Sequence, residues 1–451
     1  MRLEEKIVNE ALRQVKAHLE TGDWEGAIAV LESLRPPDQA DVFTGLPRKD
    51  QERLLPRMDV EDSADIMEQL EDEDAVELAS RLKVENLARI LDEMEPDDAA
   101  DLIGDLSPER AAEAIAAMKE PEDILPLLQY PDETAGGRMT PLPITLNAKM
   151  TVEEALNYVR LYAPDSDIIY YLFVVDDEGK LVGVVSLRQL LVASPYELVE
   201  NIMDRDVIYV HHFTDQEECA RLISRYDLLA LPVVDDEMHL LGMITVDDLM
   251  DVMEEEATED IHRLAGSEPL KEPYLTAKVF SIVRKRIGWL LLLFLAELYT
   301  GTVLRHFHRE LSQAIALSYF IPLLIGTGGN AGSQAATTVI RAMALKEVKF
   351  RDAPKVLFKE ISLGFLLGLV IGIVGFIRAI SWGSEIALSI TVGVTMATII
   401  VWANIVGSFL PMLAARLGLD PAVLSAPFVT TLVDGTGLFI YLSIAKIILG
   451  L

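Results

Sequence analysis

The chain has 451 residues, of which 51% are hydrophobic, and a formal net charge of −33. The charge is unevenly distributed: residues 286–451 carry 12 basic and 8 acidic side chains, whereas residues 1–285 carry 27 and 64. Because the acidic residues 1–285 would repel phosphate, we expect no nucleic-acid partner. The single cysteine, Cys219, argues against a secreted disulfide scaffold.

Residues 27–119 contain a repeat of twelve residues. Its last apolar positions are Leu34, Leu46, Met58, Leu70, Leu82, Met94, Leu106 and Met118. Apolar side chains also stand three and four positions before each of these, which gives one stripe on a helix. Breakers such as Pro47, Pro96 and Pro108 separate the stripes. The pattern predicts a solenoid of short helices whose exposed face is rich in acids.

A second repeat occupies residues 138–260. The stretch 174–186 returns as 233–245, an offset of 59 residues, and each copy reads strand, turn, strand and helix. Further upstream, 151–155 returns as 215–219, and each of these begins a helix with acids in its first turn. The sequence therefore predicts two similar α/β units in tandem.

The helix predicted at 246–261 is crowded with acids. Asp247, Asp251, Glu255 and Glu259 recur every four residues, with Asp248, Glu256 and Asp260 beside them. Like charges at this spacing destabilise a helix by a few tenths of a kcal/mol per pair. The face is therefore either simply solvated or neutralised by cations. The solenoid has acids of its own, such as Asp98, and two acidic surfaces would repel unless a divalent ion lay between them.

Residues 270–285 form a basic, amphipathic helix candidate suited to the inner membrane face. Long apolar runs then follow at about 287–304, 312–342, 361–381, 386–415 and 424–449. Basic side chains cluster before the first run and between the second and third, while the opposite loops hold few. The positive-inside rule therefore predicts five spans, with the N-terminus cytosolic and the C-terminus external.

The predicted spans contain unusual polar groups. Asp434 lies inside the last run, where a carboxylate costs about 2.5 kcal/mol or more unless it faces water, a partner or a cation. The stretch 326–334 in the second run combines four glycines with Asn330, and the fourth run contains Asn404. Together they suggest a polar cation path, although the glycines also fit tight helix packing. Glu297 in the first run fits a pore role, a pair with Arg305 or snorkelling.

The second repeat resembles a tandem pair of CBS domains. The whole order of acidic helical repeat, CBS pair and five spans resembles the MgtE family of magnesium channels. Its most specific stretches are 326–330, 257–262 and 432–437. The resemblance implies a multidomain chain with an all-α superhelical N domain, an α/β CBS pair and an α-helical membrane domain. The implied boundaries are 1–137 for the N domain, 138–200 and 201–262 for the CBS domains, 263–285 for a connecting plug helix and 286–451 for the pore domain.

The same resemblance implies a homodimeric, Mg2+-selective channel for uptake across the cytoplasmic membrane, in contact with membrane lipid and closed by cytosolic Mg2+. The family's pore-entry site matches Asp434 and Thr430, but this chain has Ala426 where the family often has asparagine. The family's regulatory acids match Asp65, Asp97, Asp101, Asp215, Glu217, Asp227, Asp248, Asp251, Glu256, Glu259 and Asp260. Asp420 matches a position that joins the membrane domain to the sensor, and the charge pattern adds Glu255.

CBS domains often bind adenine nucleotides, and the family's ATP contacts match Tyr171 and Arg188. Such sites commonly hold the ribose with an acid three residues after a Ser or Thr. Asp248 follows Thr245 in this way, whereas Gln189 follows Ser186 and departs from the pattern. ATP, or another adenine nucleotide, is therefore an expected ligand that this departure weakens.

Two other functions remain open. A secondary carrier would exchange Mg2+ for Na+ or H+, and Glu297 would suit a proton relay. A membrane-anchored scaffold would bind a partner through its acidic repeat, but that interpretation leaves Asp434 and Asn330 unexplained. No enzyme is expected, because the sequence contains no recognisable catalytic constellation.

Overall fold

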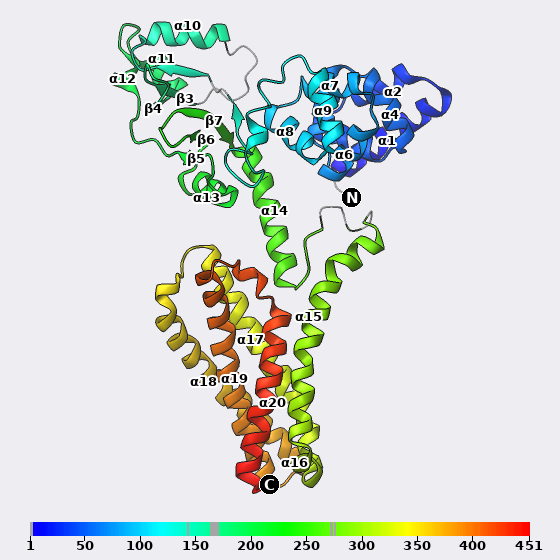
Figure 1. The fold of residues 1–451 in the computed structure, drawn as a ribbon, viewed down its shortest axis with the longest axis vertical. Helices are drawn as coiled ribbons and strands as arrows, with labels where there is room; N and C mark the ends of the chain where they lie inside the picture. Colours follow the sequence, from blue (N-terminus) through cyan, green and yellow to red (C-terminus); the bar gives the residue numbers. More distant parts are fainter. Residues whose placement is uncertain (1–2, 142–143, 163–170, 271–273, 275–276) are drawn as a thin grey trace. The chain divides into compact units, whose positions relative to one another are not determined.

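The computed structural model describes residues 3–141, 144–162, 171–270, 274 and 277–451. The chain forms two compact units, Met1–Glu256 and Ala257–Leu451 (Figure 1). The acidic repeat and both α/β units lie in the first, and the apolar runs lie in the second.

The first unit begins with a superhelix of short helices. These are α1 (Leu3–Thr21), α2 (Trp24–Leu31), α3 (Pro36–Thr44), α4 (Arg48–Leu54), η1 (Leu55–Arg57), α5 (Val60–Glu68), α6 (Asp72–Arg81), α7 (Val84–Leu91), α8 (Pro96–Asp105), α9 (Pro108–Ala117) and η2 (Leu127–Gln129). Alternate helices pack together, with α3 on α5, α5 on α7 and α4 on α6. The predicted solenoid is confirmed as an all-helical repeat.

The recurring apolar positions lie just beyond the helices rather than inside them. Leu46, Leu82, Leu106 and Met118 each follow a helix, or occupy its C-cap, and are buried. A buried apolar residue just past a helix end fixes the direction in which the chain leaves it. The repeat therefore specifies the turns between helices as well as the apolar stripe on each helix.

The second part of this unit holds two small sheets. One has the order β2 (Thr145–Asn147), β3 (Tyr171–Val175), β4 (Leu181–Ser186), and the other β1 (Thr140–Pro141), β7 (Leu240–Thr245), β6 (Ala230–Val234), β5 (Val210–His211). The antiparallel hairpins share one register: Phe173 pairs with Val184, and Pro232 with Met243. These pairs differ by the 59-residue offset of the repeat, so the duplication is confirmed strand by strand.

Helices complete each copy. They are α10 (Val152–Tyr162), α11 (Leu187–Val192) and α12 (Val199–Ile202) in the first copy and α13 (Gln216–Tyr226) and α14 (Val246–Leu264) in the second. The last helix crosses from the first compact unit into the second. A single helix therefore connects the acidic first unit to the second unit.

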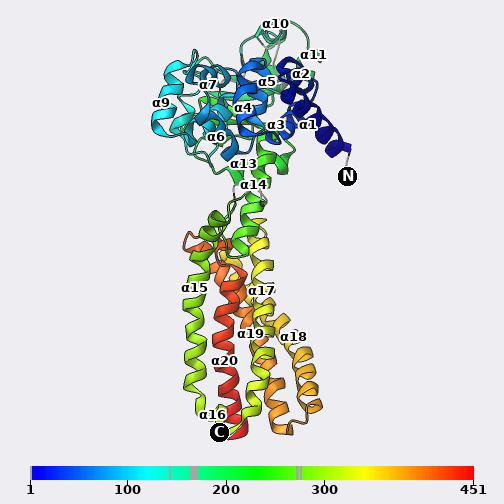
Figure 2. The ribbon, with the colours of Figure 1, turned by 90° about the vertical axis from the view of Figure 1, so that its right-hand side faces the viewer.

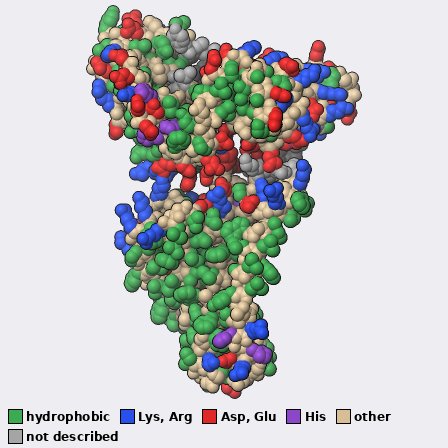
Figure 3. Space-filling model, viewed as in Figure 1, with side chains coloured by type: hydrophobic (Ala, Val, Ile, Leu, Met, Phe, Trp, Pro, Cys, Tyr) green, Lys and Arg blue, Asp and Glu red, His purple; other side chains and the backbone are tan. Residues whose placement is uncertain are grey.

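The second unit consists mainly of long helices. They are α15 (Val279–His306), α16 (His308–Gln313), η3 (Ile315–Phe320), α17 (Ile321–Ala344), η4 (Phe350–Asp352), α18 (Ala353–Ser381), α19 (Ile386–Arg416), η5 (Pro421–Val423) and α20 (Ala426–Leu449). Among the described residues, five helical segments are long and apolar enough to cross a membrane. Figure 2 shows α15, α20, α17, α19 and α18 as one bundle, and apolar side chains cover its visible face in Figure 3.

The connecting segment differs from the single helix expected at 263–285. Residues 263–264 end α14, and residues 279–285 already belong to α15, which continues directly into the first span. No proline stands between Val279 and Gly288 to stop that helix. Residues 271–273 and 275–276 lie outside the described residues. The basic residues Arg284 to Arg286 are therefore part of the first membrane helix.

Candidate ion path and acidic cluster

Helix α20 presents the candidate ion ligands. Ser425 caps its start by accepting a hydrogen bond from the Phe428 backbone N–H. Thr430 and Asp434 then lie one turn apart, and Ser333 of α17 hydrogen-bonds the Thr430 hydroxyl at 2.9 Å. Asp434 is half-buried, and its Oδ1 atom is buried without a hydrogen-bond partner among the described residues. A buried carboxylate oxygen with no donor is a suitable ligand for a cation.

The glycines of α17 allow α20 to approach this closely. A Cβ atom on Gly329 would lie 2.6 Å from Thr430 Cγ2 and 3.3 Å from Asp434 Oδ1. One turn later, a Cβ on Gly332 would meet Val429 at 3.2 Å. Tight packing and a polar path, the two interpretations of these glycines, therefore coincide on the same helix face. Asn330 is exposed on α17 in the single chain.

Asn404 lies in a different setting from Asp434. Its Nδ2 atom donates to Glu360 Oε2 of α18 at 3.0 Å, and both residues are buried. The pair joins α18 to α19 beside Gly364, where a Cβ would come within 3.5 Å of Asn404 Cβ. No sequence pattern singled out Glu360, a third carboxylate in the membrane helices beside Asp434 and Glu297. Its signal was an acid directly before the apolar run that begins at residue 361.

Glu297 is exposed on α15 and lines a hollow of about 380 Å3. Phe294, Leu298 and Arg305 from the same helix also line it. Helix α15 packs against α20, the helix that carries Asp434. Arg305 faces the same hollow without a recorded ion pair to Glu297 among the described residues.

In the first unit, the acids of α8 meet those of α14. Burial raises the pKa of Asp97 to about 8, and the like charges of neighbouring carboxylates, Asp248 first among them, add to the shift. Asp98 follows it on α8 and is exposed, with Asp97 and Asp248 close enough to repel its charge. Burial also raises the pKa of Asp101 to about 7, although the positive charge of Arg138 opposes this shift. Asp251 also has a raised pKa, through burial and the adjacent acids of its helix. The metal-free unit therefore concentrates unfavourable negative charge at this contact.

Arg138 lies between these two acidic helices. It donates to Asp101 of α8 at 3.0 Å, to Glu255 of α14 at 3.3 Å and to Gln216 of α13 at 3.2 Å. Gln216 in turn donates to Glu256 at 2.8 Å. Sequence analysis did not single out Arg138 or Gln216. We call Asp97, Asp98, Asp101, Asp248, Asp251, Glu255 and Glu256 the acidic cluster.

Other predicted regulatory acids hold local structure. Asp215 caps α13 by accepting from the Glu217 backbone N–H at 3.0 Å, and Asp227 ends the same helix in a left-handed conformation. Asp65 lies on α5, next to Glu68, whose carboxylate accepts from the Glu95 backbone N–H at 2.7 Å. These interactions position the acids but leave carboxylate oxygens able to bind a hydrated ion.

At the end of α14, within the membrane unit, Arg263 pairs with both Glu259 and Asp420, the latter at 2.6 Å. Asp420 lies in the segment between α19 and α20, six residues before the start of α20. Asp260 lies on the same turn as Glu259. The structure thus brings two predicted regulatory residues, Glu259 and Asp420, to one arginine beside the helix that carries Asp434.

The predicted nucleotide residues fall in two places. Tyr171 of β3 pairs with Ser186 of β4, and Arg188 follows Ser186 by two residues. Tyr171 and Arg188 therefore lie at the same end of the first sheet. Gln189 forms a capping box with Ser186. Asp248 instead accepts from the Thr245 backbone N–H at 3.1 Å at the start of α14, and lies in the acidic cluster.

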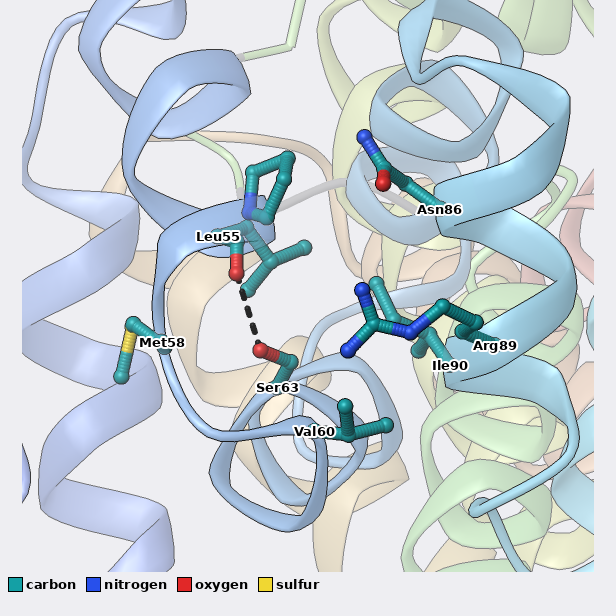
Figure 4. A pocket seen from close by; sticks show the side chains of 8 residues that line it. Leu55, Met58, Val60, Ser63, Asn86, Arg89 and Ile90 are labelled. Carbon is teal, nitrogen blue, oxygen red and sulfur yellow. Dashed lines mark hydrogen bonds between the residues drawn. The ribbon is translucent and has the colours of Figure 1, made fainter.

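Among the described residues, no group of three or more His, Cys, Asp or Glu converges closely enough to enclose a metal ion. Mg2+ usually keeps several waters and binds through one or two carboxylates, so oxygen ligands of this kind still fit it. A pocket between η1, α5 and α7 is too small to bind a ligand, since its volume of about 10 Å3 suits one water. Inside it, the Ser63 hydroxyl donates to the Leu55 carbonyl (Figure 4).

The chain matches three family models: an MgtE intracellular N domain over residues 34–133, CBS domains over 136–196 and 199–255, and the divalent cation transporter model MgtE over 321–444. The magnesium transporter MgtE of Thermus thermophilus is 45% identical over 323 residues, which cover 72% of each chain. This chain belongs to the MgtE family. A magnesium transporter MgtE of Enterococcus faecalis is 39% identical over 73% of this chain and 72% of its own.

Solved structures agree with this MgtE assignment. The soluble part of a magnesium transporter is 33% identical with a TM-score of 0.51, over 55% of this chain and 99% of that one. The cytosolic domain of the Mg2+ channel MgtE in complex with ATP is 36% identical, with a TM-score of 0.51, over 53% and 99%. An inosine-5'-monophosphate dehydrogenase of Methanocaldococcus jannaschii, 34% identical, matches only 24% of this chain. The expected multidomain fold of helical N domain, CBS pair and membrane helices is confirmed.

Proposed function

We propose that this MgtE protein is a homodimeric, Mg2+-selective channel for magnesium uptake across the cytoplasmic membrane. The observation that carries the proposal is Asp434, a carboxylate within a membrane helix whose Oδ1 has no hydrogen-bond donor in the described part of the chain. Thr430 lies one turn away, and the glycines of α17 let that helix approach α20 closely at this point. The carboxylate would attract a divalent ion, and the oxygen lining would hold it with much of its water.

Flux through reconstituted protein tests this proposal. Asp434→Asn keeps the size and shape of the side chain but removes the charge, so we expect Mg2+ flux into dye-loaded liposomes to fall at least tenfold. Asn330→Ala on the same path should have a smaller effect, because no charge is lost. Unchanged flux in Asp434→Asn would exclude Asp434 from the ion path and remove the main support for the proposal.

The alternative is a carrier that couples Mg2+ to Na+ or H+, for which Glu297 is the candidate relay. Current recordings without any counter-ion gradient distinguish the two. A channel gives Mg2+ current that follows voltage alone, whereas a coupled carrier requires the second gradient. Glu297→Gln should leave channel current largely intact and should abolish proton-coupled exchange.

We also propose that cytosolic Mg2+ closes the channel by neutralising the acidic cluster. Burial first, and then the like charge of Asp248, raises the pKa of Asp97, and a divalent ion would relieve this unfavourable negative charge. Helix α14 carries this cluster at one end and, through Arg263, holds Asp420 near α20 at the other. We therefore expect millimolar Mg2+, but not Na+ at equal ionic strength, to protect the chain from limited proteolysis. Equal protection by both salts would exclude specific Mg2+ sensing.

An adenine nucleotide, ATP in particular, is proposed to bind at the CBS pair. Tyr171 and Arg188 share one sheet end, and Tyr171 is 45% exposed and thus open to stack on a base. Equilibrium dialysis with labelled ATP should show weaker binding for Tyr171→Ala, whereas Tyr171→Phe should retain it. Equal binding by all three proteins would place the nucleotide elsewhere.

The N-terminus is proposed to be cytosolic and the C-terminus external, and lipid is proposed to contact the apolar faces of α15 and α18. The basic residues at the start of α15 and between α17 and α18 support this orientation.

A further inference from the structure

A partly buried arginine occupies the contact between the helical repeat and the CBS pair. Arg138 precedes β1, and its guanidinium reaches Asp101 on α8 and Glu255 on α14, at 3.0 and 3.3 Å. Its side chain is only 25% exposed. Because Asp101 belongs to the repeat and Glu255 to the last helix of the CBS pair, this one cation links both acidic surfaces.

The backbone fixes where this arginine lies. Ala135 and Gly136 donate to the Thr214 and His212 carbonyls at 2.7 and 2.8 Å, and Arg138 donates to Thr134 at 3.1 Å. At Gly137 a Cβ atom would come 2.5 Å from the Pro131 carbonyl oxygen. Glycine is thus required where the chain turns beneath the second CBS copy. The guanidinium is therefore held in place by the fold and does not depend on a mobile loop.

Gln216 is the third hydrogen-bond partner of the Arg138 guanidinium. Arg138 Nε donates to Gln216 Oε1 at 3.2 Å, and Gln216, which is 6% exposed, donates to Glu256 at 2.8 Å. A single guanidinium therefore organises two consecutive acids of α14, Glu255 directly and Glu256 through an amide. Its planar fork suits this, since its donors are fixed in direction.

One charge cannot neutralise the whole cluster. Asp97, Asp98 and Asp248 lie close enough for their charges to repel one another, and Asp97 is 7% exposed. Arg138 therefore offsets part of the repulsion and leaves the rest for a diffusible cation.

We propose that Arg138 is a built-in counter-ion that holds the helical repeat against the CBS pair at low Mg2+ and so sets the Mg2+ concentration at which the channel closes. This inference rests on the proposed function. The arginine contributes a fixed part of the required positive charge, and Mg2+ contributes the remainder. A chain without the arginine must obtain that part from Mg2+ as well.

The test compares Arg138→Gln with the intact chain, reconstituted in liposomes. Two curves against cytosolic Mg2+ are measured: closure of Mg2+ flux, and protection from protease between the repeat and the CBS pair. We expect both midpoints to rise about fivefold, the order of one partly buried charge-assisted hydrogen bond. In EDTA, the variant should also be cleaved faster. An unchanged or lower midpoint overturns the proposal, because a lower value means that Arg138 occupies a place that Mg2+ would take.

Two further variants keep the test decisive. Arg48→Gln removes an arginine that pairs with Asp74 and Glu77 inside the repeat, so its midpoint should match that of the intact chain. Arg138→Lys keeps the charge but loses the fork, so its midpoint should fall between those of the intact chain and Arg138→Gln. If Arg138→Gln does not fold, the lysine variant alone decides: a midpoint raised about twofold supports the proposal, and an unchanged or lower one overturns it.

The experiment distinguishes failure of Mg2+ gating from failure of the role proposed for Arg138. If Mg2+ neither protects nor closes the intact chain, the proposed gating function fails. If Mg2+ does both, yet Arg138→Gln leaves the midpoints where they were, only the role of Arg138 is lost.

Discussion

At the scale of single residues, the two buried membrane carboxylates differ in what surrounds them. Asp434 Oδ1 has no donor among the described residues, whereas Glu360 Oε2 accepts from Asn404 at 3.0 Å. The first arrangement leaves an oxygen for a cation, and the second binds two helices together. Sequence position alone did not separate them, because the partner of Asn404 lies 44 residues away.

This difference predicts a structural effect for Asn404. Asn404→Ala leaves Glu360 without its donor, so we expect the membrane unit to lose about 1 kcal/mol of stability, the order measured for interhelical hydrogen bonds in membranes. Thermal unfolding in detergent would show a lower midpoint. Glu360→Gln is the matched control, since an amide oxygen can still accept from Asn404. A change in Mg2+ flux without any change in unfolding would instead return Asn404 to the ion path, as the sequence suggested.

At the scale of elements, hydropathy and periodicity predicted the helices and strands well. The five spans lie close to the apolar runs, and the 59-residue repeat anticipated two hairpins in the same register. The start of α15 was not anticipated, because the change from basic to apolar residues near Ile287 marks a membrane boundary and not a helix boundary. Long-range side-chain pairs, such as Arg138 with Glu255, leave no local pattern to recognise.

The contacts between membrane helices depend on particular glycines. A Cβ on Gly407 of α19 would lie 2.2 Å from the Gly332 carbonyl oxygen of α17, and backbone cannot move aside as a side chain can. Gly407→Ala should therefore force α17 and α19 apart and cost about 1–3 kcal/mol. Detergent unfolding measures the loss. Gly326→Ala on α17 is the control, because no described residue outside its own stretch of helix lies within 4 Å of the Cβ position, and it should be neutral or slightly stabilising. Equal effects of both variants would contradict this packing.

At the scale of the whole molecule, charge is separated from apolar surface along the chain. The acids are concentrated in the first unit and the long apolar helices in the second, and α14 belongs to both. Composition alone predicted this division. It could not predict that protons can partly substitute for metal at the acidic cluster, because that follows from the burial of Asp97 and the partial burial of Asp101.

The raised pKa values give the acidic cluster a defined pH dependence. A carboxyl whose pKa is higher in the packed state than in the open state binds protons more tightly when packed. Packing is therefore favoured by low pH and weakens as pH rises from about 4, the ordinary carboxyl value, toward the packed values of about 7 to 8. Asp97, which is 7% exposed, dominates the upper part of this range, since burial first and then the charge of Asp248 raise its pKa to about 8.

Without Mg2+, we therefore expect protease protection of the first unit to be stronger at pH 6 than at pH 9. Added Mg2+ should narrow this difference by restoring protection at pH 9, where the carboxylates are ionised and bind a cation best. Asp97→Asn mimics the protonated state, so it should flatten the pH dependence in EDTA, while Asp38→Asn, on α3 and outside the acidic cluster, should leave it unchanged. Protection that grows with pH in EDTA would show that the carboxyls of α8 are not buried against α14 in solution.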